Sequence, residues 1–140
     1  MATTAQYSTA PTIDVSQIST ANTNRDGSGT TVEIAAGPTS AAASGVGKRI
    51  LGVAIQATGS TTAGMVRLFI SVDGGTTKRL IEEIPVTANT VSATNPAWNA
   101  TAGNVVGIVL PGQVSSNTQK LYAATEKGET FNVIVYGATY

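Results

Sequence analysis

The 140-residue sequence contains no cysteine and no histidine, and it has few charged residues. Without cysteine there is no disulfide and no thiol nucleophile, and without histidine the commonest general base at neutral pH is missing. The usual nitrogen and sulfur ligands of zinc, copper and iron are missing for the same reason. The composition therefore argues against an enzyme, and we predict no catalytic residue, no cofactor-binding residue and no metal site.

Charge is scarce as well as balanced. Eight basic residues offset eight acidic ones, and charged residues are 11% of the chain, against roughly 25% in a typical soluble domain. A net charge of zero favours association with other proteins. The basic pairs Lys48-Arg49 and Lys78-Arg79 are isolated, whereas phosphate binding needs clustered cations, so nucleic acid is not an expected partner.

The sequence also lacks a signal-peptide pattern and a long apolar run. Residues 1–5 contain no basic region followed by an apolar stretch. No apolar segment approaches the roughly 20 residues that span a bilayer. We therefore expect a protein that is made in the host cytoplasm and has no membrane partner.

Threonine, alanine, serine, glycine and valine dominate what remains, and frequent glycine-rich breaks leave no room for a helix of ten residues. We expect a flexible N-terminal arm over residues 1–11 and one β domain over residues 12–140. About eight strands predict an all-β fold, a single antiparallel β-sandwich that is jelly-roll-like. The expected strands are 13–18, 30–36, 48–57, 65–72, 77–84, 105–110, 120–125 and 130–136.

Two short segments predict hairpins. The turn at Asp73-Gly74-Gly75-Thr76 lies between two β-rich runs, which is a strong local hairpin signal. Residues 126–129, with the sequence Glu-Lys-Gly-Glu, are interpreted as the four-residue loop of a second hairpin.

One pattern is compatible with a cation site. Asn22, Asn24 and Asp26 alternate before Gly27, and Glu33 follows at the spacing of a twelve-residue calcium loop. The first position is asparagine where the motif has aspartate, and strands flank the segment where the motif has helices. We therefore favour a turn, and whether a cation binds there stays open.

Other candidate chemistry has a simpler interpretation. Glu82 and Glu83 are adjacent, so in a strand they point to opposite faces and cannot form a catalytic carboxylate pair. Serine and threonine hydroxyls lack a histidine to activate them. Five aromatic residues are compatible with a sugar platform, but dispersed along strands they are more typical of core or interface residues. They are Phe69, Trp98, Tyr122, Phe131 and Tyr136.

Several segments, in this order and at this spacing, resemble a family of small structural proteins of tailed bacteriophages. They are NRDGSGT at 24–30, TTAGMVRLFI at 61–70, RLIEEIPVTANTVSATNPAW at 79–98, VLPG at 109–112 and LYAATEKGETFNVIVYG at 121–137. The resemblance covers most of residues 22–137, with 99–120 the least similar part, and it contains no catalytic signature.

The resemblance implies a virion component without enzymatic activity, most specifically a capsid decoration, or cement, protein. Such a protein would be a homotrimer on the capsid surface, bound to the major capsid protein through its N-terminal arm, its loops or both. The alternative is a tail, neck or fibre-associated virion β domain, or a head-attached module that touches host glycans, and whether any glycan is bound stays open. The copy number in particles would distinguish these roles.

Overall fold

The chain forms a two-layer β-sandwich in a computed structural model that describes residues 10–38, 47–112 and 118–140. Within these ranges it has nine strands and no helix, and therefore no helix that could cross a membrane. The strands are β1 (Ala10–Ile18), β2 (Val32–Ala36), β3 (Gly47–Ala57), β4 (Gly64–Ser71), β5 (Arg79–Val86), β6 (Asn99–Ala102), β7 (Val109–Pro111), β8 (Lys120–Thr125) and β9 (Phe131–Thr139). The predicted all-β sandwich is confirmed.

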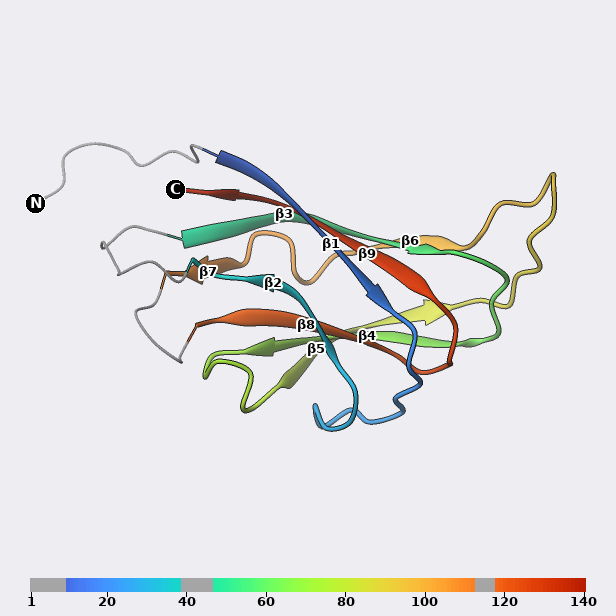
Figure 1. Cartoon of the computed structure of the whole chain (residues 1–140), viewed down its shortest axis with the longest axis horizontal. Coiled ribbons are helices and arrows are strands. Elements are labelled where there is room, and N and C mark those ends of the chain that lie inside the picture. Colours follow the sequence, from blue (N-terminus) through green and yellow to red (C-terminus); the bar gives the residue numbers. More distant parts are fainter. Residues whose placement is uncertain (1–9, 39–46, 113–117) are drawn as a thin grey trace, which may run out of the picture.

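The two sheets have the strand pairing of a jelly roll (Figure 1). Sheet A has the order β1-β9-β3-β6, with β7 pairing a second part of β3, and sheet B has the order β2-β8-β4-β5. Every pairing between named strands is antiparallel. The first half of the chain thus pairs with the second half in reverse order: β1 with β9, β2 with β8, β3 with β6 and β7, and β4 with β5.

The core fills the space between the sheets. In sheet A, Val53 pairs with Val135 and Ile55 with Val133, and all four side chains are buried. Because side chains alternate along a strand, the residues between them point to the opposite, outer face. Trp98 packs edge-to-face on Phe131 at 5.7 Å between ring centroids, near one end of this core.

Seven of the eight predicted strands match an observed strand closely, and the region 86–110 differs. Of the predicted strand 105–110 only its end, in β7, is extended, since residues 103–107 form turns. A strand that was not predicted, β6, precedes them and pairs with Val53–Gln56 of β3. The strand predicted over 77–84 continues through Pro85 to Val86, because β5 is an edge strand of sheet B and an edge strand tolerates proline.

The hairpin predicted at residues 73–76 is confirmed. β4 and β5 pair antiparallel on either side of it, and Gly74 and Gly75 have φ values of 73° and 98°, which favour glycine. Asp73 Oδ1 accepts hydrogen bonds from Thr77 N and Ser71 Oγ, both at 2.8 Å. These bonds, the Thr77 amide first, lower the pKa of Asp73 to about 2.

The hairpin predicted at 126–129 is wrong. β8 belongs to sheet B and β9 to sheet A, so this segment crosses between the sheets. Thr125 ends β8 beside Ala21 in an isolated bridge, and Phe131 begins β9 beside Ala57. A short polar turn between two strands does not reveal whether the chain returns to the same sheet.

The arm predicted over residues 1–11 falls mostly outside the described residues, which begin at Ala10. Ala10 and Pro11 are the first residues of β1 and pair with Thr139 and Ala138 of β9. β1 is an edge strand of sheet A, and the rest of the predicted arm, residues 1–9, lies outside the described residues.

Candidate functional site

The candidate cation loop is held together by its own hydrogen bonds. Asn22 is 5% exposed, and its Nδ2 donates to the carbonyl oxygens of Ser28 and Thr30, both at 2.9 Å. Its Oδ1 accepts a bond from Asn24 N at 3.0 Å. The amide of Asn22 is thus the centre of a turn, as the preferred interpretation expected.

The two carboxylates of the motif have separate partners. Asp26 Oδ1 accepts bonds from the Ser28 hydroxyl at 2.6 Å and the Ser28 amide at 2.9 Å, and these bonds, the hydroxyl first, lower the pKa of Asp26. Glu33 instead pairs with Lys120 Nζ at 3.0 Å. Within the described ranges, no three acidic side chains lie together as a metal site would need.

Glu82 and Glu83 point to opposite faces of β5, as predicted, and each binds side chains or backbone groups of a different part of the fold. Glu82 accepts bonds from the backbone amides of Gly103 and Asn104, at 2.9 and 3.0 Å, and so closes the β5–β6 edge of the sandwich. Glu83 pairs with Arg67 at 2.8 Å and with Arg25 at 2.6 Å on the outer face of sheet B. Neither carboxylate is left free for chemistry.

The segment 19–31 covers the outer face of sheet B. Arg67, 1% exposed, donates to the carbonyl of Asn22 at 3.2 Å, and Arg25 reaches Glu83. Gly27 lies against Lys78, the residue before β5, and a Cβ added to Gly27 would be only 2.4 Å from the carbonyl oxygen of Lys78. Beneath lies a small buried cluster of Phe69, Tyr122 and Ala124.

The five aromatic residues do not form one platform. Trp98 and Phe131 pack on each other at the core, and Phe69 and Tyr122 belong to the cluster under sheet B's covering segment. Tyr136 is on the opposite side of the molecule, in β9. The core and interface interpretation of these side chains agrees with this placement.

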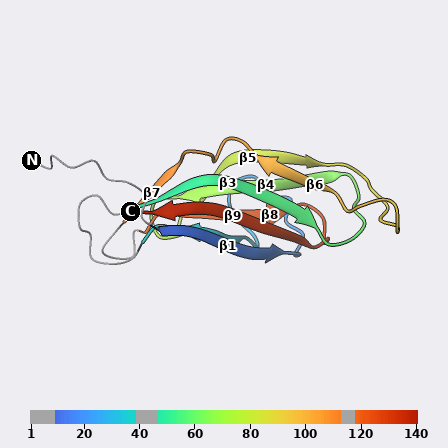
Figure 2. The same cartoon turned by 90° about the horizontal axis from the view of Figure 1, so that it is seen from above.

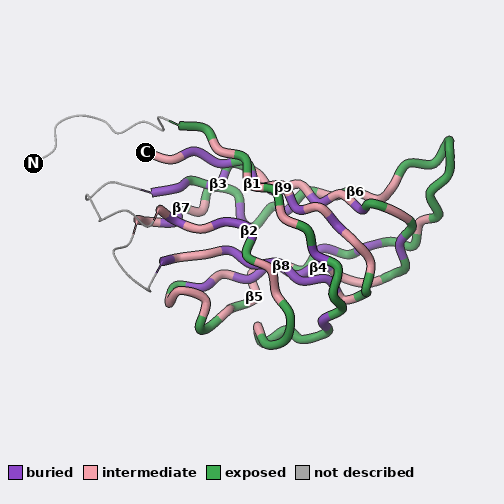
Figure 3. The backbone as a smooth tube through the Cα atoms, in the orientation of Figure 1, coloured by how far each residue is buried: buried purple, intermediate pink, exposed green. Residues whose placement is uncertain are grey.

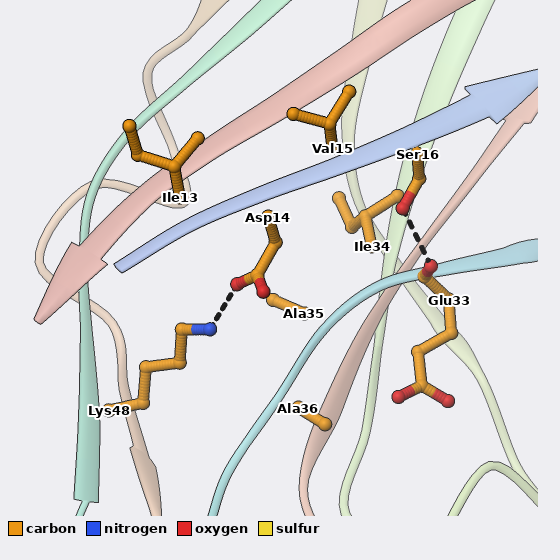
Figure 4. A pocket seen from close by; sticks show the side chains of 9 residues that line it. All are labelled: Ile13, Asp14, Val15, Ser16, Glu33, Ile34, Ala35, Ala36 and Lys48. Atoms are coloured by element: carbon orange, nitrogen blue, oxygen red, sulfur yellow. Dashed lines mark hydrogen bonds and ion pairs between the residues drawn. The ribbon is translucent and has the colours of Figure 1, made fainter. Parts of the chain in front are cut away.

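An open groove of about 390 Å³ lies between the edge strands β1 and β2 (Figure 4). Its polar groups largely bond to one another: Lys48, 6% exposed, pairs with Asp14, and Ser16 Oγ donates to the carbonyl of Glu33 at 3.2 Å. A charge that points inward from an edge strand, such as Asp14, opposes indiscriminate strand pairing at that edge. The groove is therefore a protected edge of the sandwich.

The outer face of sheet A is different, because large apolar side chains lie on it in contact with water. Ile13 and Val15 point away from the groove (Figure 4) and are 66% and 64% exposed. Their partners across β9 are Tyr136 and Ile134, and Gly52 and Ala54 of β3 continue the same two rows. Leu51, in a β-bulge of β3, is also exposed.

A row of amides borders these apolar rows. This row contains Gln17, Asn132, Gln56 and Asn99, which are register partners across β1, β9, β3 and β6. Gln17 Nε2 donates to Asn132 Oδ1 at 3.0 Å. We call the apolar rows and this amide row the bare face. It consists of Ile13, Val15, Gln17, Leu51, Gly52, Ala54, Gln56, Asn99, Thr101, Asn132, Ile134 and Tyr136.

The bare face carries no charged residue. Arg49, which pairs with Ala138, lies beyond its apolar end, at the rim. In Figure 2 no described segment crosses over β1, β9 and β3. Figure 3 shows that the residues of β1 are mostly exposed or half-buried, in contrast with the buried residues of the core strands. Exposed, contiguous apolar surface of this kind is typical of protein interfaces.

A second prominent feature is the connection between β5 and β6, residues 87–98, which projects beyond one end of the sandwich (Figure 1). Ser92 and Asn95 exchange backbone hydrogen bonds at 3.0 and 3.3 Å near its tip. Asn89 bonds Thr61 through both backbone groups and donates to the Pro96 carbonyl at 2.8 Å. We call this hydrogen-bonded loop the 87–98 finger.

Sequence reasoning missed the bare face. The sequence places Ile13 and Val15 in a strand. The polar residues that alternate with them are its only indication of which side of that strand faces the core. In β9, Val133 and Val135 alternate with Ile134 and Tyr136, so the pattern is apolar on both faces.

Comparison with known proteins adds no relative: no family model, no curated protein and no solved structure matches this chain.

Proposed function

We propose that this protein is a structural component of a tailed-bacteriophage virion, a capsid decoration protein that binds the major capsid protein on the outer head surface and stabilises the shell. The bare face is the observation that supports this proposal most. Its side chains are apolar, amide or hydroxyl groups, so covering them would remove apolar area from water without burying an unpaired charge.

The 87–98 finger supplies the kind of protruding contact that a shell-binding protein needs. Its backbone is already ordered by internal hydrogen bonds, so binding through it would cost little additional conformational entropy. A protein that binds only the assembled shell stabilises that shell by mass action. Many copies bound at repeated positions would add avidity.

Rebinding to phage heads tests the proposal. Purified protein added to heads from a phage lacking this gene should bind until sites are filled, and it should raise the temperature at which the heads rupture. Heads that already carry the protein are the control, since their sites are occupied and should take up almost none. Absence of saturable binding to the depleted heads would contradict the proposed function.

A further inference from the structure

Lys48 is the one lysine that is buried in the part of the chain that the structure describes. Its side chain is 8% exposed, whereas Lys78, Lys120 and Lys127 are half-buried or exposed. Its Nζ is in direct contact with Oδ2 of Asp14, and Figure 4 shows the two groups facing each other. An amine and a carboxyl group that are held in contact are the reactants of an amide bond as well as the partners of an ion pair.

The sheet brings these two side chains together across an intervening strand. Lys48 belongs to β3 and Asp14 to β1, and β9 lies between these strands. The side chain of Lys48 passes Gly137 of β9, where an added Cβ would lie 3.3 Å from Lys48 Cε and 2.9 Å from a carbonyl oxygen of β3. Because glycine has no side chain, the path of Lys48 to Asp14 stays open.

The groups around the pair favour a reaction between its members. Thr12, two residues before Asp14 and so on the same face of β1, has a buried Oγ1 without a hydrogen-bond partner among the described residues. Buried polar groups are rarely left unpaired. The side chain of Asp14 is 39% exposed and lines the open groove, so a small molecule released there can leave. Glu33 also lines this groove, but its carboxylate pairs with Lys120 and does not compete for Lys48.

We propose that Lys48 and Asp14 become joined by an isopeptide bond, an amide between Lys48 Nζ and Asp14 Cγ. Transfer of a proton from the ammonium to the carboxylate gives an amine and a carboxylic acid. The amine nitrogen then attacks Cγ, and the bond from Cγ to the hydroxyl oxygen breaks. That oxygen leaves as water with a second proton from the nitrogen. One positive and one negative charge disappear together, and no other reactant is consumed.

Positioning supplies the driving force that free lysine and free aspartate lack in water. Well-oriented groups held in contact react as if one of them were present at about 10⁵ M or more. The fold holds Lys48 in this way, since its side chain is enclosed between β3, Gly137 and Asp14. The bond would therefore form after folding and without an enzyme.

The bond would strengthen an edge of the sandwich. Among the described strands β1 pairs only with β9, so hydrogen bonds to one neighbour hold it in the sheet. A covalent link from Asp14 to Lys48 spans β9 and ties β1 to β3. Separation of β1 from the sheet would then require a covalent bond to break. This inference goes beyond the proposed function and does not rest on it.

The intact mass of the denatured full-length protein tests the bond. The wild type should be lighter by one water molecule than the mass calculated from its sequence, with the N-terminal residue determined separately. Lys48→Arg keeps the cation but has no amine, and it should have its full calculated mass. Lys120→Arg is the matched control, since it alters the more exposed Glu33–Lys120 pair and should lose water as the wild type does.

Peptide mapping locates the link. Trypsin does not cleave after an acylated Lys48, so the digest of the wild type should contain residues 1–25 joined to residues 26–49. Asp14 is the only side-chain carboxyl group in the first peptide, and Lys48 is the only lysine in the second. The joined peptides therefore identify both ends of the bond, and this measurement does not depend on how any variant folds.

The Asp-Gly pairs at 26–27 and 73–74 provide another way to lose one water, because such pairs can form a cyclic imide. An imide would persist in Lys48→Arg and would be reversed by mild alkali, and this result would overturn the isopeptide bond. A wild type at its full calculated mass, or residues 1–25 recovered only as a separate peptide, would overturn it as well. None of these measurements uses phage heads, so failure of the decoration role would leave their results unchanged.

Discussion

Replacing Phe131 with alanine is expected to lower the free energy of unfolding by about 4 kcal/mol, the range for deleting a large buried ring. Phe131 is 1% exposed, pairs with Ile18 and Ala57 in the register of sheet A, and supports the ring of Trp98 at 87° between ring planes. Its removal would leave a cavity among strands that are fixed on both sides. Equilibrium denaturation in urea measures this change. The slope of the unfolding free energy against urea concentration should stay the same, provided that the folded state of the variant is as compact as that of the wild type.

The control for this prediction is Val72→Ala, which removes apolar atoms from a side chain that is 61% exposed. It should alter stability by less than about 0.5 kcal/mol. Similar losses in the two variants would show that Phe131 does not belong to a packed core.

Replacing Glu83 with alanine is expected to cost about 3 kcal/mol, because it removes the closest partner of a buried cation. The side chain of Arg67 is 2% exposed, with Glu83 at 2.8 Å and Glu126 at 3.6 Å. Loss of Glu83 also frees Arg25 of the segment 19–31, so the cover of sheet B would loosen. The melting temperature should fall by about 10 °C.

Glu33→Ala is the matched control for Glu83→Ala, since it breaks the Glu33–Lys120 pair, whose side chains are 43% and 25% exposed. An exposed pair contributes about 1 kcal/mol or less. If Glu33→Ala destabilised as much as Glu83→Ala, burial of Arg67 would not be the cause.

Lowering the pH should remove the stabilisation that Glu83 provides through its ion pairs with Arg67 and Arg25. The hydrogen bond from Arg67, followed by the contacts with Arg25, holds the pKa of Glu83 below its ordinary value of 4.5. Because the folded state lowers this pKa, the stabilisation is complete above pH 4.5 and is lost as the pH falls through the folded-state value. The stability difference between the wild type and Glu83→Gln should therefore shrink below pH 4.5. A difference that is constant down to strongly acidic pH would contradict this role.

The sequence predicts the β-sandwich well because its strands are marked by β-branched residues and glycine-rich turns. It does not predict β6, whose residues Asn-Ala-Thr-Ala have little intrinsic preference for a strand. Pairing with Val53–Gln56 of β3 holds these residues extended. Tertiary contacts, and not intrinsic preference, therefore make this segment a strand. The false hairpin at 126–129 has a related origin, since local turn chemistry carries no information on which sheet receives the next strand.

The bare face is harder to predict, because it depends on which side of a strand faces the core. In β1 the inward positions are Thr12, Asp14 and Ser16, since this edge strand lies over the groove, and the apolar residues point outward. A rule that places apolar residues inside would orient this strand wrongly. Only the register with β9, where Ser16 pairs with the buried Val133, shows its orientation.

Counting the copies of this chain in intact particles tests the central claim most directly, that the protein is a repeated part of a phage head. Quantitative mass spectrometry of purified virions, calibrated against the major capsid protein, should find hundreds of copies per particle. A few or a few dozen copies would place the protein in the neck, tail or fibres, and its absence from particles would contradict a virion role altogether.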